Sequence, residues 1–591
     1  MTRVVIVGGA GVFGRRLAEG LRATTNADLI IAGRSRARAE AAALAVGAFE
    51  VTVLDRERAT PEDVRALNAD LVIDAAGPFQ GADLRFACAV IEAGANYLDL
   101  ADARDFVAAF PSLDSLAHQH GVAAISGASS TPALTHAVLD ELRAGWKRVD
   151  IIRAGIAPAN QMDRGPAVMK AILTWVGAPV PVFEDGAWRV RAGWSDCGLI
   201  DVPMLGRRRF ALAETPDLDL MPARYAPRDA ALFMAGLELW FMQRGLEFMG
   251  ALRRRGAVRK PVALAEPLRF AGDLLGPFGS DRGGMIVEVF GRDAEDRPMR
   301  ARWTMFAPNG LGPYTPTFAA LALAQRFVQE GTLPLGAHPC VAMLRLADFE
   351  PEFARHGFTT KIDFTPLVSP FEAALGADFQ KLPAPVQAAH RSGPVARFSG
   401  QARVEGATSP FGKILARLFG FPPAQACVNV HVTKRNLGEV ETWTRQFGAR
   451  RLQSRLRTMG PGIVRESFGP FDFDMKISVA NGKLAMTVVA WRLGPIPLPA
   501  FLAPRSTATE SIGAHGRFRF DVPISLPLVG RLTHYSGWLE LDDSLPARGG
   551  CREACFATGG AAAPPSAGMA LAPHPSASAA RKPTPSPGGE G

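Results

Sequence analysis

Three glycines near the N-terminus have the spacing of a dinucleotide-binding loop. Gly9, Gly11 and Gly14 form the pattern G-x-G-x-x-G, with an apolar run at 4–7 before it and an amphipathic stretch at 15–21 after it. The first glycine permits a tight turn, the second lets the backbone approach a pyrophosphate, and the third lets the helix pack on the strand. The pattern alone is weak, but its place between a predicted strand and a predicted helix indicates a pyrophosphate site at the helix N-terminus.

The residues after the second predicted strand indicate which nucleotide binds. The strand at 29–32 is followed by Gly33, Arg34 and Ser35, and Arg34 lies 20 residues after Gly14. An NAD site usually has Asp or Glu there, which binds the ribose 2′-hydroxyl. A guanidinium would instead pair with a 2′-phosphate, and the Ser35 hydroxyl would add a hydrogen bond. A solvated arginine at a helix start is the alternative, but the sequence favours NADP(H) over NAD(H).

Two further strand ends contribute candidate cofactor contacts. Asp55 closes the third strand and either meets the adenine edge or caps the helix that begins after Thr60. Small residues at 75–78 close the fourth strand, where they would let the nicotinamide ribose lie against the backbone. The predicted cofactor-binding residues are Gly8, Gly9, Ala10, Gly11, Val12, Phe13, Gly14, Gly33, Arg34, Ser35, Asp55, Ala76, Gly77 and Pro78.

Hydride transfer also requires a group that supplies or removes a proton. Tyr97 and Asp99 are the candidates, because residues two apart on a strand share one face. Each has a structural alternative, since Asp99 would cap the next turn and Tyr97 would pack as a core aromatic. His136 is interpreted as a packed or surface histidine. His118 and His120 are expected to face solvent.

The elements around these residues predict the fold. Short apolar runs alternate with amphipathic stretches through residue 147, which is typical of a Rossmann-type α/β domain with a doubly wound parallel sheet. Residues 148–345 predict an α+β domain for substrate binding or dimerisation, with a hairpin at 285–306 and a helix at 317–330. Residues 363–542 predict a β-rich domain, and the tail at 543–591 is too poor in apolar bulk to order.

Within the β-rich domain, two features stand out. Asn481 and Gly482 separate two alternating segments, the strongest short signal for a β-hairpin. Glu441, Trp443, Arg445 and Phe447 alternate, so one face of a strand would carry all four. They would line a pocket for a polar-headed ligand or, as the sequence slightly favours, form a cross-strand ion pair over a tryptophan on a solvated sheet. Arg465, Glu466 and Glu510 would complete either arrangement.

Several motifs, in this order and spacing, resemble the saccharopine dehydrogenase-like oxidoreductases. They are the segments 9–14, 32–34, 75–79, 94–99 and 127–132, together with Cys88. The resemblance covers residues 1–145 well and extends loosely to 345. It implies an NADP(H)-dependent oxidoreductase that acts on a C=O, C=N or C=C bond of an unknown substrate, lipid-like substrates included. Residues 363–542 resemble a family of unknown function often fused behind such reductases, which brings no known chemistry.

The lack of an evident proton donor supports an alternative function. The chain would then be a non-catalytic protein that senses NADP(H) or binds a ligand in its β-rich domain. Either function involves a small molecule rather than nucleic acid, because the net charge of +9 comes with no reader motif or basic-aromatic stripe.

Cysteine usage and one apolar stretch bear on location and partners. The six cysteines are scattered, which indicates a reducing cytoplasm and no metal site. The stretch at 232–252 is rich in Leu, Phe and Met, and basic residues follow it up to Lys260. As a helix it would be buried at a domain interface, the favoured interpretation, or would make a peripheral membrane contact through residues 232–260. A homodimer is the other partner expected.

Overall fold

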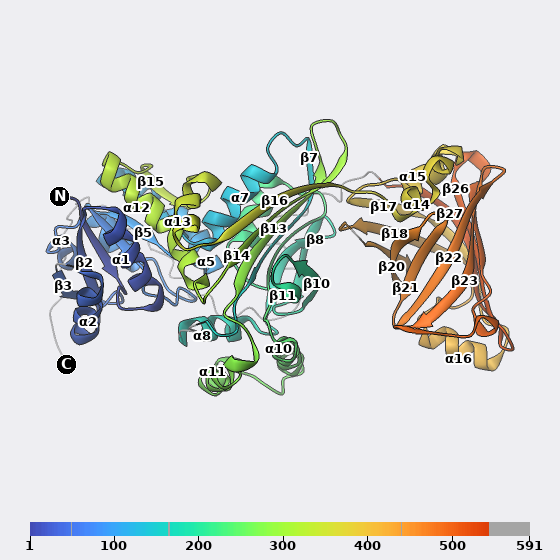
Figure 1. The fold of residues 1–591 in the computed structure, drawn as a ribbon, viewed down its shortest axis with the longest axis horizontal. Helices are drawn as coiled ribbons and strands as arrows, with labels where there is room; N and C mark the ends of the chain where they lie inside the picture. Colours follow the sequence, from blue (N-terminus) through green and yellow to red (C-terminus); the bar gives the residue numbers. More distant parts are fainter. Residues whose placement is uncertain (49, 163–165, 439, 543–591) are drawn as a thin grey trace, which may run out of the picture. The chain divides into compact units, whose positions relative to one another are not determined.

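The computed structural model describes residues 1–48, 50–162, 166–438 and 440–542, which form three β-sheets with helices packed around them (Figure 1). A parallel sheet, a mixed sheet and a closed antiparallel sheet follow in that order, which confirms the predicted fold class. The tail at 543–591, predicted to be disordered, lies outside the described residues. Within the described ranges, no helix has the length and apolar character that a membrane span requires.

The first sheet is parallel and has the strand order β15-β6-β5-β4-β1-β2-β3. The chain runs outward from the central β1 in one direction and then in the other, as in doubly wound sheets. Its last strand, β15, comes from residues 336–339, so the predicted domain boundary at 147 does not mark the end of this sheet. Its strands are β1 (Arg3–Val7), β2 (Asp28–Gly33), β3 (Glu50–Val53), β4 (Leu71–Asp74), β5 (Asn96–Asp99), β6 (Ala123–Ser126) and β15 (Gly336–Pro339).

Both faces of this sheet are buried at its central strands β1 and β2, which explains why these strands are apolar runs without a polar face. Val4 and Ile6 belong to one hydrophobic cluster, whereas Val5 and Val7 belong to another. Successive side chains on a strand point to opposite faces, and helices cover both faces of a parallel sheet. The helices of this part are α1 (Val12–Thr24), α2 (Arg36–Val46), α3 (Pro61–Arg65), α4 (Arg85–Glu92), α5 (Arg104–Ala109), α6 (Asp114–His120), α7 (Thr135–Leu142), α12 (Phe318–Glu330) and α13 (Glu350–Arg355).

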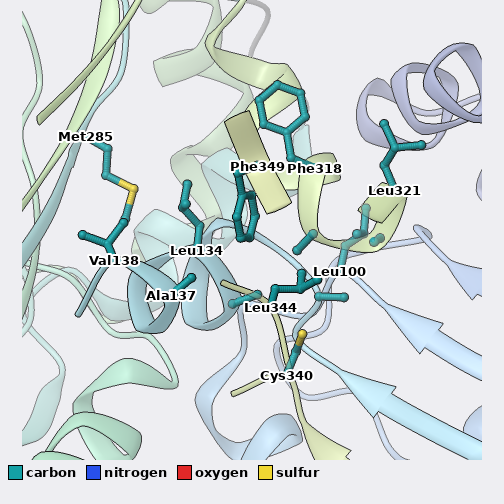
Figure 2. Close-up of a cluster of buried hydrophobic side chains, with 14 of the residues drawn as sticks. Leu100, Leu134, Ala137, Val138, Met285, Phe318, Leu321, Cys340, Leu344 and Phe349 are labelled. Atoms are coloured by element: carbon teal, nitrogen blue, oxygen red, sulfur yellow. The ribbon is translucent and has the colours of Figure 1, made fainter. Parts of the chain in front are cut away.

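One of these clusters continues into the second sheet. Figure 2 shows Leu134, just before α7, and Val138, within α7, near Met285 of strand β13 (Gly283–Arg292), together with Phe318 and Phe349. All five side chains are buried. Because this apolar surface is continuous, the first two sheets share a core.

The second sheet is mixed, with the strand order β10-β11-β12-β7-β13-β14-β16; β8 pairs with β12, and β9 pairs with β8. The predicted hairpin at 285–306 is confirmed as β13 and β14. Strand β16 belongs to this sheet although it lies beyond residue 345, where the second domain was predicted to end. The remaining elements are β7 (Arg148–Ala157), β8 (Pro179–Glu184), β9 (Ala187–Ala192), β10 (Asp196–Val202), β11 (Gly206–Leu212), β12 (Ala230–Ala235), β14 (Pro298–Ala307), β16 (Thr359–Pro366), α8 (Pro166–Trp175), α9 (Asp217–Tyr225), α10 (Trp240–Arg254) and α11 (Ala265–Leu274).

The helix predicted over 232–252 is wrong in its first part. Residues 230–235 form the buried strand β12, and α10 begins only at Trp240. Strand β12 lies between β11 and β7, and this pairing outweighs the helix propensity of its Ala, Leu and Met residues. Nor is the helical part fully buried, since Trp240 is 71% and Phe248 63% exposed.

The third sheet closes on itself. Ten antiparallel strands follow the order β22-β21-β20-β19-β18-β17-β27-β26-β25-β23, and β23 pairs back with β22. The predicted turn at Asn481 and Gly482 is confirmed, because both residues have a positive φ. The elements are β17 (Val395–Glu405), β18 (Gln425–Asn436), β19 (Glu441–Phe447), β20 (Arg450–Gly460), β21 (Ile463–Phe468), β22 (Phe471–Ala480), β23 (Lys483–Leu493), β24 (Ile496–Pro497), β25 (Thr507–Ile512), β26 (Phe518–Leu526), β27 (Gly530–Leu541), α14 (Pro370–Leu375), α15 (Ala384–His390) and α16 (Pro410–Leu418).

Candidate dinucleotide site

The glycine loop between β1 and α1 is too tight for side chains at two positions. Gly8 has φ +78°, and a Cβ on it would lie 2.8 Å from the Cα of Ala76. A Cβ on Gly14 would lie 2.3 Å from the carbonyl oxygen of Gly8. The turn therefore depends on Gly8 rather than on Gly9, to which the sequence pattern assigned it. Gly14 has the predicted role, because it lets α1 approach the loop.

The N-terminus of α1 remains available to an anion. Gly11 is its N-cap residue, no side chain caps the helix, and its first turn contains no acidic residue. The Gly11 N–H donates to the Gly8 oxygen over 2.8 Å, which holds the loop in shape. Val12, Phe13 and Gly14 follow as the first helical residues, whose N–H groups have no partner within the helix. With Ala10 in the loop, they form a short stretch of backbone suited to phosphate oxygens.

Arg34 lies at the end of β2, beside this loop in the sheet order. Its side chain is exposed and forms no ion pair or hydrogen bond with a residue that the structure describes. Ser35 is the N-cap of α2, and its hydroxyl accepts from the Arg38 N–H. Gly33 has open space around its missing Cβ. The carboxyl end of β2 thus presents an unpaired cation where an adenosine ribose would lie in a doubly wound sheet.

Asp55 does not cap the helix after Thr60, which removes one of its two predicted roles. Helix α3 is capped by a reciprocal pair of hydrogen bonds between Thr60 and Asp63. Asp55 instead accepts from the Glu57 N–H over 3.2 Å within the turn after β3. Its other predicted role, at the adenine edge, stays a prediction.

Arg56 is a residue that sequence reasoning missed. Its Nε lies 2.9 Å from the buried Asp74 carboxylate, and its Nη1 donates to the Ala76 oxygen over 2.6 Å. Its guanidinium also lies over the Phe79 ring. Arg56 therefore holds the loop after β4, in which Gly77 and Pro78 stay exposed. No sequence signal indicated this, because the two loops are 20 residues apart and follow strands that are not neighbours.

Tyr97 and Asp99 are both fully enclosed at the end of β5. The Tyr97 hydroxyl donates to Asp74 over 3.4 Å, and its ring stacks on Phe110. Asp99 Oδ1 accepts from the N–H groups of Ala101 and Gly127, over 2.9 and 2.7 Å. Asp99 thus takes its predicted structural alternative, since it caps the turn that follows and fastens the loop after β6.

Asp99 makes the stability of this part depend on pH. Burial raises the pKa of Asp99 to about 7, although the hydrogen bonds from Gly127 and Ala101 lower it. Because the folded-state pKa is raised, the contribution to stability is complete below the unfolded pKa of about 4 and is lost as the pH rises through about 7. Replacing Asp99 with Asn should therefore reduce the loss of unfolding free energy between about pH 5 and about pH 7 by about 2 kcal/mol.

Urea unfolding at several pH values would measure this effect. Asp83→Asn is the matched control, because Asp83 is exposed and pairs with Arg85 at the surface. An Asp99→Asn protein whose stability varies with pH as the wild type does would contradict the assignment.

His136 is buried in a polar network. Of its two predicted alternatives, a packed or a surface histidine, the packed one is confirmed. Its Nδ1 lies 3.1 Å from the Tyr225 hydroxyl, and its Nε2 lies 3.3 Å from the Asp217 carboxylate. Asp217 also accepts from the Thr131 hydroxyl over 2.8 Å. The network joins the loop after β6 to α9. His118 and His120 are exposed, as predicted.

Residues 4–146 match the family model of the saccharopine dehydrogenase NADP binding domain. Over these residues the chain is similar to saccharopine dehydrogenase NADP binding domains. This match confirms the predicted resemblance and supports an oxidoreductase that uses a nicotinamide cofactor. Residues 382–539 match a family model described as a domain of unknown function, DUF4166, as the second resemblance predicted.

Solved structures match the chain at low sequence identity and low TM-score. The apo histidine-tagged saccharopine dehydrogenase (L-Glu forming) from Saccharomyces cerevisiae is 13% identical, with a TM-score of 0.44, and the match covers 62% of this chain and 100% of that one. GenD2 from gentamicin A biosynthesis, in complex with NAD, is 16% identical, with a TM-score of 0.31 and coverage of 61% and 96%. No curated protein matches the chain.

Proposed function

We propose that this protein is an NADP(H)-dependent oxidoreductase. The observation that carries the proposal is the exposed guanidinium of Arg34 at the end of β2, next to a glycine loop that excludes side chains at Gly8 and Gly14. An acidic residue at this position would repel a 2′-phosphate, whereas an arginine pairs with it. The family match supports the same cofactor, since its description specifies NADP.

The residues present fit this cofactor along its length. The pyrophosphate would lie on the loop at 8–11 and on the first N–H groups of α1. Arg34, with Ser35, would hold the 2′-phosphate, and Asp55 would meet the adenine. The backbone at 76–78 would border the nicotinamide ribose. When bound, the nicotinamide supplies or accepts the hydride; the substrate bond is C=O, C=N or C=C, lipid-like substrates included.

Isothermal titration calorimetry with the full chain tests cofactor choice. We expect NADPH to bind at least about tenfold more tightly than NADH, since charge-assisted hydrogen bonds to one phosphate contribute roughly 1.5–3 kcal/mol. Equal affinity would contradict the assignment of Arg34, and no heat with either nucleotide would contradict the site as a whole.

A second candidate function is a sensor that binds NADP(H) without turnover. The observation that favours it is the complete burial of Tyr97 and Asp99, the candidate proton donors, which have no exposed surface. Incubation with NADPH and a metabolite extract separates the two functions. Oxidation of NADPH above the rate of the extract alone supports the enzyme, whereas bound NADPH that is never oxidised supports the sensor.

The location and the partners other than the cofactor stay predictions. A cytoplasmic protein with peripheral membrane contact through residues 232–260 is compatible with the exposed aromatic rings of Trp240 and Phe248 and with the exposed Arg254, Arg255 and Lys260. Aromatic rings beside cations are typical of surfaces that bind anionic lipid. A homodimer likewise stays a prediction.

A further inference from the structure

The closed third sheet surrounds a cavity. An eight-stranded barrel is just wide enough for its side chains to fill, so ten strands leave more space inside. The cavity has a volume of about 380 Å³, within the range of about 300–1,000 Å³ for small-molecule sites. Phe371 of α14 and Leu415 of α16 both line it. Since these two helices cover opposite ends of the barrel (Figure 1), the cavity extends along its length.

The wall of this cavity is almost entirely apolar. Its large side chains include Trp443, Phe447, Phe473, Trp491 and Phe520. Polar metabolites would lose their hydration in so apolar a cavity without gaining hydrogen bonds in return. The cavity therefore favours a ligand whose surface is mainly hydrocarbon. The family model that matches this part assigns it no function, and cofactor binding by the first sheet does not use it.

The charged groups of the wall lie around Trp443, and each has a partner. Arg445 lies 3.2 Å from Glu466, and its guanidinium lies over the Trp443 ring. Glu510 hydrogen-bonds the buried His390, whose ring stacks on Trp443. The sequence had slightly favoured a solvated sheet for the row from Glu441 to Phe447. The ion pair over a tryptophan that belonged to this interpretation is present, but the solvated face is wrong, because closure of the sheet turns this face inward.

The Tyr535 side chain offers a polar group to a ligand. The Tyr535 hydroxyl lines the cavity and makes no hydrogen bond to a residue that the structure describes. Burial raises the pKa of Tyr535 to about 12, with Arg445, Glu466 and Glu510 close enough to affect it. The hydroxyl therefore keeps its proton and can donate to a ligand oxygen. A charged head group would be disfavoured, since the nearby charges already have partners and a further buried ion would have none.

The end of the barrel at α16 is suited to the entry of such a ligand. Phe411, Ile414 and Leu418 are 58–78% exposed on one side of α16, whereas Leu415 on the other side lines the cavity. Ser409, the N-cap of α16, donates to the Val529 oxygen, which places the helix beside the turn that carries the fully exposed Leu528. A helix with apolar residues on both sides is unusual at a surface and provides a continuous hydrocarbon path inward.

We propose that the barrel binds an elongated, uncharged hydrophobic molecule with a hydroxyl or carbonyl oxygen, such as a long-chain alcohol, aldehyde or ketone. The hydrocarbon body occupies the aromatic cavity, and the oxygen accepts a hydrogen bond from Tyr535. The balanced pair of Arg445 and Glu466 excludes the corresponding carboxylate. This proposal is independent of cofactor binding by the first sheet.

Displacement of a fluorescent probe from the full chain tests the proposal. The probe is the uncharged N-phenyl-1-naphthylamine, and the competitors are 1-hexadecanol and hexadecanoate at a pH where the acid is ionised. We expect the probe to bind and hexadecanol to displace it at concentrations at least about tenfold lower than hexadecanoate, the ratio that corresponds to 1.4 kcal/mol. Absence of probe binding, or equal competition by the two ligands, would overturn the proposal.

Two pairs of variants locate the site. Ala508→Phe fills part of the cavity and should weaken probe binding at least about tenfold, whereas Thr507→Phe, exposed on the same strand, should not. Glu466→Gln leaves the Arg445 charge without its partner and should shift the preference toward hexadecanoate. Glu540→Gln, whose residue pairs with Arg517 at the surface, should leave the preference unchanged.

The shift in Glu466→Gln is a gain of binding that misfolding cannot mimic. Circular dichroism and the melting temperature of each variant would verify that Ala508→Phe folds. A Glu466→Gln protein with wild-type preference, or a Thr507→Phe protein as weak as Ala508→Phe, would overturn the placement of the ligand inside the barrel.

Discussion

Replacing Arg34 with Asp should reverse the cofactor preference from NADPH to NADH. The substitution removes the charge-assisted hydrogen bonds to the 2′-phosphate and adds a carboxylate that repels it. The same carboxylate would accept a hydrogen bond from the ribose 2′-hydroxyl of NADH. We expect the ratio of the two dissociation constants to change by about 100- to 1,000-fold, from the loss of roughly 1.5–3 kcal/mol together with the added repulsion.

Calorimetric titration of both nucleotides into each protein would measure this change. Lys147→Asp is the matched control, because Lys147 is exposed in the same part of the chain and the substitution changes the net charge equally. It should leave the ratio as in the wild type. If Arg34→Asp binds NADPH as tightly as the wild type does, Arg34 is a solvated residue, and the cofactor proposal loses the observation on which it depends.

Replacing Gly14 with Ala should abolish binding of either nucleotide. The new Cβ would lie 2.3 Å from the Gly8 oxygen and 2.8 Å from the Gly9 Cα, which are backbone atoms that no rotamer change can move. Helix α1 must therefore shift away from the loop, and its N–H groups lose their position at the pyrophosphate. We expect affinity to fall at least about 100-fold, which corresponds to roughly 2.7 kcal/mol.

Gly245→Ala provides the control for this substitution. Gly245 also lies inside a helix, α10, and a Cβ on it would meet no neighbour within 4 Å. That variant should be stabilised by about 1 kcal/mol, since Ala has the higher helix propensity, and should bind the cofactor normally. Thermal melting measured beside calorimetry distinguishes a lost site from a lost fold. A folded Gly14→Ala protein with wild-type affinity would contradict the assigned role of Gly14.

Much of the fold could be predicted because local patterns and tertiary contacts agree. Strands such as β1 and β2 are apolar on both faces, and the turn at Asn481 and Gly482 requires the positive φ that those residues tolerate. The predictions failed where distant segments pair. Strand β15 joins the first sheet from residues 336–339, and β12 overrides a helix-forming sequence by pairing with β7 and β11.

In the candidate cofactor site too, residues within one local segment could be predicted, whereas contacts between distant segments could not. Gly14 and Arg34 were recognised from spacing, because their surroundings come from one strand–loop–helix segment and the strand after it. Arg56 was not, since its partners Asp74 and Ala76 lie at the end of β4 and in the loop after it, and only the assembled sheet brings them within 2.9 and 2.6 Å. Tyr97 and Asp99 have side chains suited to acid–base chemistry, but spacing alone could not show that the folded chain buries both of them.

What the sequence determined by itself is the nucleotide-binding segment, because a phosphate loop is local and its glycines act through their own backbone. Only the tertiary structure decided whether the alternating side chains from Glu441 to Phe447 face solvent or a cavity. Alternation along β19 places these side chains on one face, but whether that face meets solvent or a cavity depends on β22 pairing with β23 to close the sheet. That closure is a contact between strands, and the alternation within a single strand is the same on an open sheet and on a closed one.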